Sequence, residues 1–392
     1  MQRYNAMRIG FLLNHYDSHQ VPHLVPFAFK LSELYPDIEV VILSSTLEQQ
    51  DFAKDIAAYY PDQRCHFKTI SASPLIELID PILSQWFFIR KSAVIRENIT
   101  VLSTFDSLIV PELTSLALKK HDSFRDIKLI FTGHGAGDNE NFPPFDKRLG
   151  EFDLCLVPGK KYAEIVTRRG LVTPTGYAIS GYPKFEAVAP FSKDRPQFFN
   201  NSNPTVIYNP HHHPNHSSWP RLGEKILDFF YANKQYNLIF APHVLLFKRK
   251  LGRGSSLPKA YQNQDNIILD LGSRASIDMT YMNAADIYFG DSSSQIYEFL
   301  SRPRPCVFFD TLPPRSDDEL PYFNWNFGSV VKNAENLEDN IALALSTHNK
   351  FLPIQKKSFA HTFEIGATTA AERGARIIEA FSRTGTVDPQ WQ

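Results

Sequence analysis

The sequence has few cysteines, and none of them has a spacing typical of a disulfide framework or a metal site. Cys65, Cys155 and Cys306 lie far apart, in or beside apolar stretches. A disulfide-stabilised secreted fold and a cysteine-based zinc site are therefore not predicted. We expect reduced thiols, as in a cytoplasmic protein.

Long apolar runs and an excess of charge of one sign are also lacking. No stretch of about 18 consecutive apolar residues occurs, and no basic segment followed by an apolar run opens the chain, so neither a membrane span nor a standard secretion signal is predicted. The formal net charge of -1 gives no support to a nucleic-acid partner. The 31 Phe and 16 Tyr leave open a peripheral contact with the inner face of the cell membrane.

Three familiar site motifs are missing as well. The chain has no GxGxxG fingerprint, no Walker loop and no GxSxG elbow. A nucleotide or catalytic site must therefore be sought among the residues that follow predicted strands.

What the sequence does contain is a regular alternation of short apolar runs with helical segments. This pattern predicts α/β architecture with mostly parallel sheets covered on both faces. At 392 residues the chain exceeds what one core usually supports, so two domains are expected. Strands are predicted over 8–13, 38–43, 66–70, 107–110, 127–131, 154–157, 205–208, 237–241, 266–270, 287–289 and 306–309, and helices over 21–34, 47–59, 74–90, 219–232, 277–283 and 367–383.

A change of composition near the middle of the chain predicts the domain boundary. Between about 185 and 204 the residues are mainly Pro, Asn, Ser, Lys and Asp, as in a linker. We expect an N-terminal domain over 1–185 and a C-terminal domain over 204–365. The segment 351–363 reads as an irregular bridge, and a C-terminal helix within 366–392 is expected to pack back on the N-terminal domain.

Ligands of open parallel sheets bind beyond the carboxyl ends of the strands. Two loops of the first half of the chain follow predicted strands and contain candidate residues for such a site. Asn14 and His15 follow the first predicted strand and are candidates for the acceptor side of a site. His134 lies between Gly133 and Gly135 after a later strand, where a histidine can serve as a general base. The alternative is a flexible loop in which His134 only bonds its neighbours.

The loop after the strand 205–208 holds four histidines within six positions, 211 to 216. Metal binding is the minority interpretation, because Pro210 and Pro214 stiffen the loop and no nearby carboxylate or cysteine completes a ligand set. We therefore predict no metal and no cofactor. The imidazoles of this loop are expected to face a phosphate or an acceptor, and we assign His211 and His213 to the binding of a phosphate-containing donor.

Two further loops of the second half complete the predicted donor site. His243 follows the strand 237–241 and precedes a basic run at 248–250, whose lysines are more often solvated than bound to a ligand. After the strand 287–289 come Asp291, Ser292, Ser293 and Ser294, at a predicted helix start that would offer hydroxyl and N–H groups to a phosphate. Ordinary helix capping is the alternative for these side chains.

These residues together resemble the CDP-glycerol glycerophosphotransferase family, the teichoic-acid polymerase-like enzymes with a GT-B fold. The resemblance covers mainly residues 127–383. It rests on the His-Gly loop at His134, the histidine at His243, Asp286 of an Ala-Asp pair, the Asp-Ser-Ser of 291–293, and a closing Gly-Ala-x-x-x-Ala-x-Arg from Gly366 to Arg373.

The resemblance implies two Rossmann-like domains that face each other across a cleft, the acceptor on the first and the nucleotide on the second. It implies transfer of glycerol phosphate, or a related polyol phosphate, from a CDP-activated donor to a hydroxyl of a cell-envelope polymer or lipid-linked acceptor. His134 would be the base for that hydroxyl, while His243, Ser292 and Ser293 would hold the donor diphosphate. An imidazole would remove the proton, and N–H and hydroxyl groups would stabilise the charge that develops as CMP leaves.

The chain departs from the family pattern at three places. The family usually has Trp before its His-Gly pair and Pro after the second histidine, where this chain has Gly133 and Val244, and the Asp-Tyr-Ser-Ser of the family is replaced by a version with three serines. That version also resembles UDP-GlcNAc 2-epimerases and glycosyltransferases that use a nucleotide-sugar donor for capsule or lipid-linked glycan. A non-catalytic scaffold for envelope assembly is the alternative from outside the enzymes.

Overall fold

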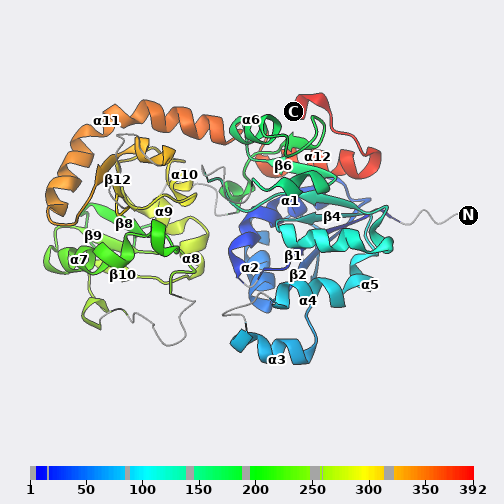
Figure 1. The fold of residues 1–392 in the computed structure, drawn as a ribbon, viewed down its shortest axis with the longest axis horizontal. Coiled ribbons are helices and arrows are strands. Elements are labelled where there is room, and N and C mark those ends of the chain that lie inside the picture. The colour runs from blue at the N-terminus through cyan, green and yellow to red at the C-terminus, as the bar shows by residue number, and fades with distance from the viewer. Residues whose placement is uncertain are drawn as a thin grey trace, which may run out of the picture. The chain divides into compact units, whose positions relative to one another are not determined.

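The chain folds into two compact α/β units, each built on its own sheet (Figure 1). Unit 1 comprises Met1–Gly135, Glu140–Pro190 and Ala360–Gln392, and unit 2 comprises Ala136–Asn139 and Phe191–Phe359. The computed structural model describes residues 6–15, 17–83, 89–137, 145–187, 195–247, 257, 259–312 and 322–392.

Unit 1 contains a parallel sheet of seven strands in the order β3-β2-β1-β4-β5-β6-β7. The chain moves outward in one direction from β1 and then in the other from β4, so the strand order reverses between these two strands. Ligands of doubly wound sheets bind beyond the carboxyl ends of the strands at such a point. Its elements are β1 (Arg8–Leu13), α1 (Val21–Leu34), β2 (Glu39–Ser44), α2 (Leu47–Ala57), β3 (His66–Thr69), α3 (Pro74–Leu83), α4 (Ile89–Glu97), α5 (Ile99–Leu102), β4 (Ser107–Val110), β5 (Lys128–Phe131), β6 (Leu154–Val157), α6 (Lys160–Arg168), β7 (Tyr177–Ile179) and α12 (Ala370–Thr384).

Unit 2 repeats this plan with six parallel strands in the order β10-β9-β8-β11-β12-β13. Its strand order reverses between β8 and β11, which makes the ends of these strands the corresponding place for a ligand. The elements are β8 (Thr205–Asn209), α7 (Trp219–Ala232), β9 (Asn237–Phe240), β10 (Ile267–Leu269), α8 (Arg274–Ile277), α9 (Thr280–Ala284), β11 (Ile287–Gly290), α10 (Gln295–Phe299), β12 (Cys306–Phe309), β13 (Ser329–Val331) and α11 (Leu337–Thr362).

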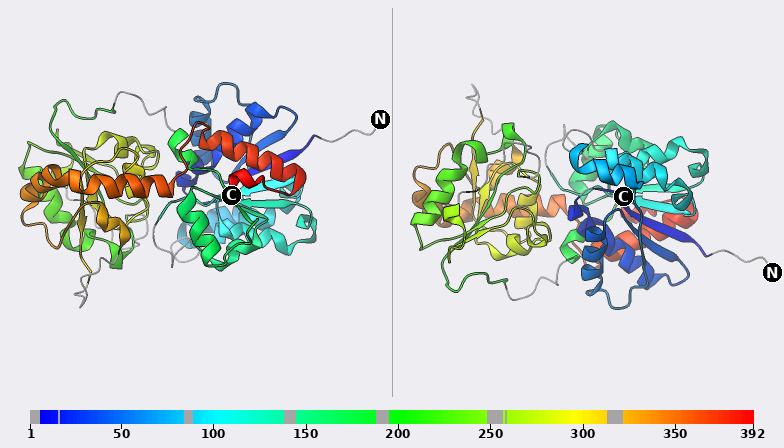
Figure 2. Two further views of the ribbon diagram at one scale, coloured as in Figure 1. Left: turned by 90° about the horizontal axis from the view of Figure 1, so that it is seen from above. Right: turned by 90° about the horizontal axis from the view of Figure 1, so that it is seen from below.

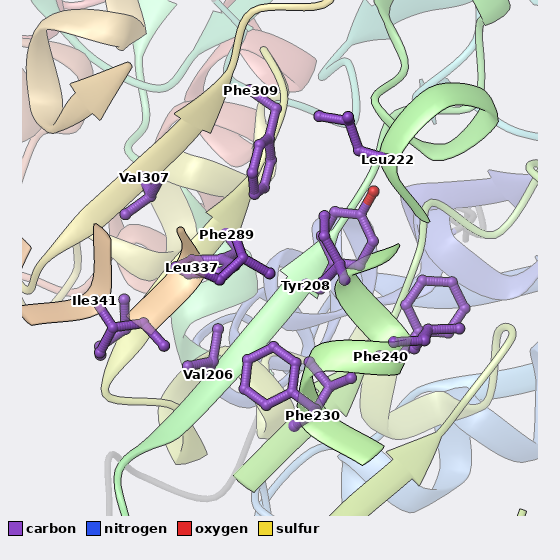
Figure 3. Packing of buried hydrophobic residues seen from close by; sticks show 14 of the residues in the cluster. Val206, Tyr208, Leu222, Phe230, Phe240, Phe289, Val307, Phe309, Leu337 and Ile341 are labelled. Atoms are coloured by element: carbon purple, nitrogen blue, oxygen red, sulfur yellow. The ribbon is translucent and has the colours of Figure 1, made fainter. Parts of the chain in front are cut away.

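The core of unit 2 shows how the apolar runs of the sequence are used. Val206 and Phe289 project from adjacent strands into a cluster with Phe230 of α7, and Leu337 and Ile341 from the first turns of α11 join the same cluster (Figure 3). Because the strands are buried on both faces, their sequences are continuously apolar rather than alternating.

The fold class predicted from the sequence is confirmed, since both sheets are parallel and helices alternate with the strands. The chain passes from unit 2 to unit 1 between Phe359 and Ala360, within the predicted bridge over 351–363. The irregular structure predicted there is wrong, because nearly all of the segment belongs to the 26-residue helix α11, with Pro353 inside it. Figure 2 shows α11 (orange) lying along unit 2. No described helix combines the length and the apolar character needed to cross a bilayer.

Two other helix predictions need correction. The helix predicted over 277–283 is two short helices, α8 and α9, because Met279 between them has a left-handed backbone with φ 72°. The helix predicted over 74–90 is described as α3 and the start of α4, and residues 84–88 lie outside the described part of the chain. The short edge strands β7 and β13 were not predicted.

Helix α12 joins unit 1 through a closely fitted contact with α1. Gly374 lies against the ring of Phe27, where an added Cβ would come within 2.2 Å of a ring carbon. The Glu186 carboxylate accepts hydrogen bonds from the N–H groups of Ala370 and Ala371, at 2.6 and 2.9 Å, and so caps the helix start. These contacts join the second half of the closing motif to the rest of unit 1.

Arg373 of the same motif has a structural role. Its guanidinium donates hydrogen bonds to the carbonyl oxygens of Ser180 at 3.1 Å and Glu364 at 2.8 Å. Gly181 passes close to it with φ 86°, and an added Cβ would lie 2.5 Å from Nη2 of the arginine. A glycine is required there by both the backbone conformation and the space.

Candidate functional site

Histidines gather beyond the carboxyl ends of the central strands in each unit. The unit 1 cluster consists of His15, His19 and His134, from the loops after β1 and β5. The unit 2 cluster consists of His211, His212, His213, His216 and His243, from the loops after β8 and β9. Each cluster therefore lies at the place where a doubly wound sheet binds its ligand.

His134 is an exposed ring held by one of its two nitrogens. Its Nδ1 lies 3.1 Å from the carbonyl oxygen of Pro111 and 3.3 Å from Nε2 of Gln20. A carbonyl only accepts, so it favours the tautomer that carries the proton on Nδ1, and the Gln20 amide is engaged with Glu112. Nε2 of His134 then carries the lone pair that a general base requires.

Glu112 connects several side chains at the unit 1 cluster. Its carboxylate accepts from the amide of buried Gln20 and forms an ion pair with Lys91, whose Nζ lies 3.2 Å from Oε1. The same Oε1 lies 3.8 Å from Nε2 of His15. Nδ1 of that ring accepts from the N–H of Asp17 at 3.0 Å, so the His15 proton resides on Nε2, facing the carboxylate.

The other unit 1 residues predicted from the sequence have supporting positions. Asn14 is completely buried, and its amide lies 3.4 Å from the hydroxyl of Thr114, so its side chain stabilises the loop after β1. Gly135 accepts a 3.4 Å hydrogen bond from the hydroxyl of Tyr162 through its carbonyl oxygen. His15 is the member of the predicted acceptor group that lies in the cluster itself.

Asp291 lies beneath the unit 2 cluster and fixes the histidine loop. Its side chain is buried, and Oδ2 accepts from the N–H groups of His211 and Ser218, both at 2.9 Å. Burial raises the pKa of Asp291 to about 7, although the two N–H donors oppose that rise. Asp291 was predicted from the sequence to bind the donor, and in the structure its Oδ2 holds the loop after β8.

Three of the five histidines of the unit 2 cluster use Nδ1 in the same way. In His211, His213 and His243 this nitrogen accepts from the backbone N–H two residues further on, at 3.0, 3.3 and 3.2 Å. The proton of each neutral ring therefore lies on Nε2, which becomes a hydrogen-bond donor. Burial lowers the pKa of His211 to about 3, so this ring is neutral at pH 7. Several N–H donors on adjoining rings suit an anion.

The serines after Asp291 lie at the start of a very short helix. Ser292, Ser293 and Ser294 are partly buried, and the Ser293 hydroxyl accepts from the N–H of Gln295 at 3.3 Å. The predicted strand and helix are both present, but α10 has only five residues. A helix dipole therefore adds little here, and any affinity for phosphate must come from the hydroxyls and the histidines.

Close packing sets the path of the chain just before Asp291. A Cβ added to Gly290 would approach the carbonyl oxygen of Asn209 to 2.8 Å. The Asn209 amide donates to the carbonyl of Ala241 at 2.6 Å and so connects the ends of β8 and β9. These contacts bring the loops after β8, β9 and β11 together.

Several site residues escaped the sequence prediction. Glu112 directly follows the predicted strand 107–110, so the rule that selected His134 would also have found it. Asp17 and His19 lie further along the first loop than Asn14 and His15, the two residues that were predicted there. Gln20 and Lys91 gave no local signal, because their roles depend on contacts with Glu112. Asp138 and the basic run at 248–250 lie outside the described residues.

Comparison with known proteins identifies similar folds. No family model matches the chain, and no curated protein matches it. Among solved structures, a protein assigned as a UDP-N-acetylglucosamine 2-epimerase from Listeria monocytogenes has 15% identity and a TM-score of 0.63, with 97% of each chain covered. The wall teichoic acid polymerase TagF, in a variant soaked with CDPG, has 13% identity and a TM-score of 0.61 over 97% of this chain and 89% of that one.

A third similar structure is that of S. aureus MnaA with UDP. It has 12% identity and a TM-score of 0.57, with 96% of each chain covered. The neighbours are all GT-B-like, which agrees with the two parallel-sheet units of this chain. At these identities the similarity establishes the fold.

Proposed function

We propose that this chain is a GT-B enzyme that uses a nucleotide-activated donor, and that it transfers glycerol phosphate or a related polyol phosphate from a CDP-linked donor. The acceptor would be a hydroxyl of a cell-envelope polymer or a lipid-linked precursor. Unit 2 would bind the donor, and His134 of unit 1 would be the base. The acceptor would bring the protein to the inner face of the membrane as a peripheral partner.

The observation that carries this proposal is the hydrogen-bonding state of the unit 2 histidines. His211, His213 and His243 use Nδ1 as an acceptor, so the proton of each neutral ring lies on Nε2. Neutral donors of this kind bind the oxygens of a diphosphate without needing a metal. The structures of TagF with CDPG and of MnaA with UDP, which have similar folds, support a nucleotide as the ligand.

The chemistry would proceed by a single displacement at phosphorus. Nε2 of His134 would take the proton of the acceptor hydroxyl, whose oxygen would bond to the phosphorus that carries glycerol. The bond from that phosphorus to the oxygen of CMP would break, and CMP would leave with the electron pair. Donors on His243 and the serines would stabilise the negative charge that grows on the phosphate oxygens.

An epimerase acting on a UDP-sugar is the second candidate. Two of the similar structures, from Listeria monocytogenes and S. aureus, support it, because one is assigned as a UDP-N-acetylglucosamine 2-epimerase and the other contains UDP. The triple serine at 292–294 also fits this alternative. A sugar-nucleotide glycosyltransferase would use the same donor groups of unit 2.

A nucleotide panel followed by a turnover assay separates these candidates. Thermal unfolding would be measured with CMP, CDP-glycerol, UDP, GDP and CMP-sugars, because a ligand that binds only the folded state raises its stability by about 2.7 kcal/mol at 100 times Kd. The proposal predicts the largest shift with CDP-glycerol, and CMP release when an acceptor is added. A preference for UDP, with conversion of UDP-GlcNAc to its 2-epimer, would replace it with the second candidate.

A further inference from the structure

We infer that His15, Asp17 and His19 of unit 1 form a binding site for a divalent transition metal of the Zn²⁺ type. This inference concerns the loop after β1 and does not depend on the proposed function. It differs from the expectation of the sequence, which considered metal only for the histidine run at 211–216 and predicted none.

The three residues offer two imidazole nitrogens and one carboxylate oxygen from a single short loop. These donor atoms all lie within 4.8 Å of one another, and the His15 and His19 rings meet edge to face with centroids 4.4 Å apart. Around tetrahedral Zn²⁺ such atoms would be about 3.3 Å apart, so the separations must shrink by up to about 1.5 Å to close the site. Small rotations of the Asp17 and His19 side chains can supply that movement.

The surroundings of His15 hold the ring in the state that a metal needs. Nε2–H of His15 faces Oε1 of Glu112 at 3.8 Å, and Nδ1 presents its lone pair toward the N–H of Asp17. A metal on Nδ1 would replace that 3.0 Å hydrogen bond. A ligating histidine whose other nitrogen faces a carboxylate is the usual arrangement in metal sites.

The backbone of this loop is also fixed before any metal arrives. The carbonyl oxygen of His15 accepts hydrogen bonds from the Ser45 hydroxyl at 3.1 Å and the Gln49 amide at 2.7 Å. The His15 side chain is 12% exposed, and its ring packs edge to face against that of His19. A loop held in this way loses little freedom when it binds an ion.

The donor set indicates the class of metal. Imidazole with a single carboxylate suits Zn²⁺ and related ions, whereas Mg²⁺ and Ca²⁺ prefer oxygen ligands alone. Three protein ligands leave a coordination position open for a water or a ligand oxygen. The His134 ring lies 5.3 Å from that of His19, so a group held at the open position would be close to the base.

The unit 2 cluster lacks a comparable set. Its nearby carboxylate, Asp291, is buried and accepts from two backbone N–H groups through Oδ2. Among the described residues, the search for groups of three ligating side chains finds the unit 1 set alone. The more histidine-rich loop is therefore the poorer metal site.

Binding of Zn²⁺ and Co²⁺ to the full chain, without a histidine tag and after treatment with a chelator, tests the inference. Calorimetry with Zn²⁺ should show one tight site, and Co²⁺ should give the visible absorption of a site with nitrogen ligands. His19→Ala should weaken Zn²⁺ binding at least 100-fold, and Glu112→Gln about 10-fold through the loss of its contact with His15. His66→Ala, on an exposed strand of the same unit, should bind as the wild type does.

Asp17→Asn keeps the size of the side chain and should still weaken binding at least 10-fold, which covers the case in which His19→Ala does not fold. Circular dichroism and thermal unfolding would establish folding for each variant. Equal affinity in the wild type, His19→Ala and Asp17→Asn would overturn the inference, as would absence of a tight site in the wild type. Loss of the tight site in a His211→Ala/His212→Ala double variant would assign it to unit 2 and also overturn the inference.

Discussion

The two histidine clusters occupy equivalent positions in their sheets, but His134 of unit 1 differs in tautomer from His211 and His243 of unit 2. The Pro111 carbonyl holds Nδ1 of His134, so the lone pair of this ring lies on Nε2. His15 of unit 1 instead shares the unit 2 arrangement. In unit 2, backbone N–H groups occupy Nδ1 of His211 and His243, so a proton lies on each Nε2. The atom that contacts the inner nitrogen decides whether the outer one accepts or donates. The number of histidines in a cluster does not determine whether that nitrogen accepts or donates.

The largest effect on the rate of transfer is expected for His134, whose Nε2 carries a lone pair. His134→Ala should lower the rate of transfer by about 10²–10⁴-fold, the usual contribution of a positioned general base. Nucleotide affinity should remain within about twofold, because the donor is assigned to unit 2. Steady-state kinetics and a direct binding measurement check both parts.

The matched variant in the other cluster is His243→Ala. It should weaken nucleotide binding about tenfold through loss of a hydrogen bond to a charged group. If His134→Ala weakened nucleotide binding and His243→Ala did not, the assignment of donor and base to the two clusters would be reversed. Unchanged turnover in His134→Ala would remove the base from the mechanism.

The next effect concerns the support of the unit 2 cluster. Asp291→Ala should lower the free energy of unfolding by about 2–4 kcal/mol, because it leaves two backbone N–H groups without their acceptor. Asp291→Asn keeps an acceptor oxygen and should lose less than half as much. Urea unfolding of the two variants measures the difference, and equal losses would show that acceptance by Oδ2 is not what stabilises the loop.

A smaller effect should appear as the pH falls. The pKa of His211 is lowered to about 3 by burial, while the unfolded chain has an ordinary histidine pKa near 6.5. Below pH 6.5 the unfolded state takes up a proton that the folded state does not, so stability falls by at most about 1.4 kcal/mol per pH unit between 6.5 and 3. His211→Asn should lose less stability over this range in urea unfolding, and parallel pH profiles would contradict the assigned neutral ring.

The smallest effect is predicted for His213, which is exposed. His213→Ala should change the free energy of unfolding by less than about 0.5 kcal/mol. Its contribution would appear only in a severalfold weaker nucleotide affinity, measured by calorimetry. A loss of stability as large as that of Asp291→Ala would mean that the loop depends on this ring for its fold.

The fold could be predicted from the sequence because its signals are local. The strand over 8–13 and the helices over 21–34 and 219–232 have the predicted bounds, since apolar periodicity is a property of neighbouring residues. Alternating strands and helices then allow few arrangements besides a parallel sheet. The irregular structure predicted over 351–363 is instead the end of α11, which continues through Pro353.

The site could be predicted only as far as the ends of the strands. Their order brings the loops that contain His134, His211 and Asp291 to the central strands of their sheets, as the rule for parallel sheets requires. The hydrogen-bond partners of Asp291 could not be predicted, because they lie 80 and 73 positions away along the chain. The histidine tautomers could not be predicted either, because each is set by one backbone atom in the folded loop.

The return of the chain to unit 1 at Ala360 has a consequence for synthesis on the ribosome. The 169 residues of unit 2 from Phe191 to Phe359 must be translated before α12 emerges, which takes on the order of ten seconds or more. During that interval Phe27 lacks the helix that covers its ring, and Glu186 lacks the N–H groups that it caps. Unit 2 can therefore complete its fold first, although translation of unit 1 begins earlier.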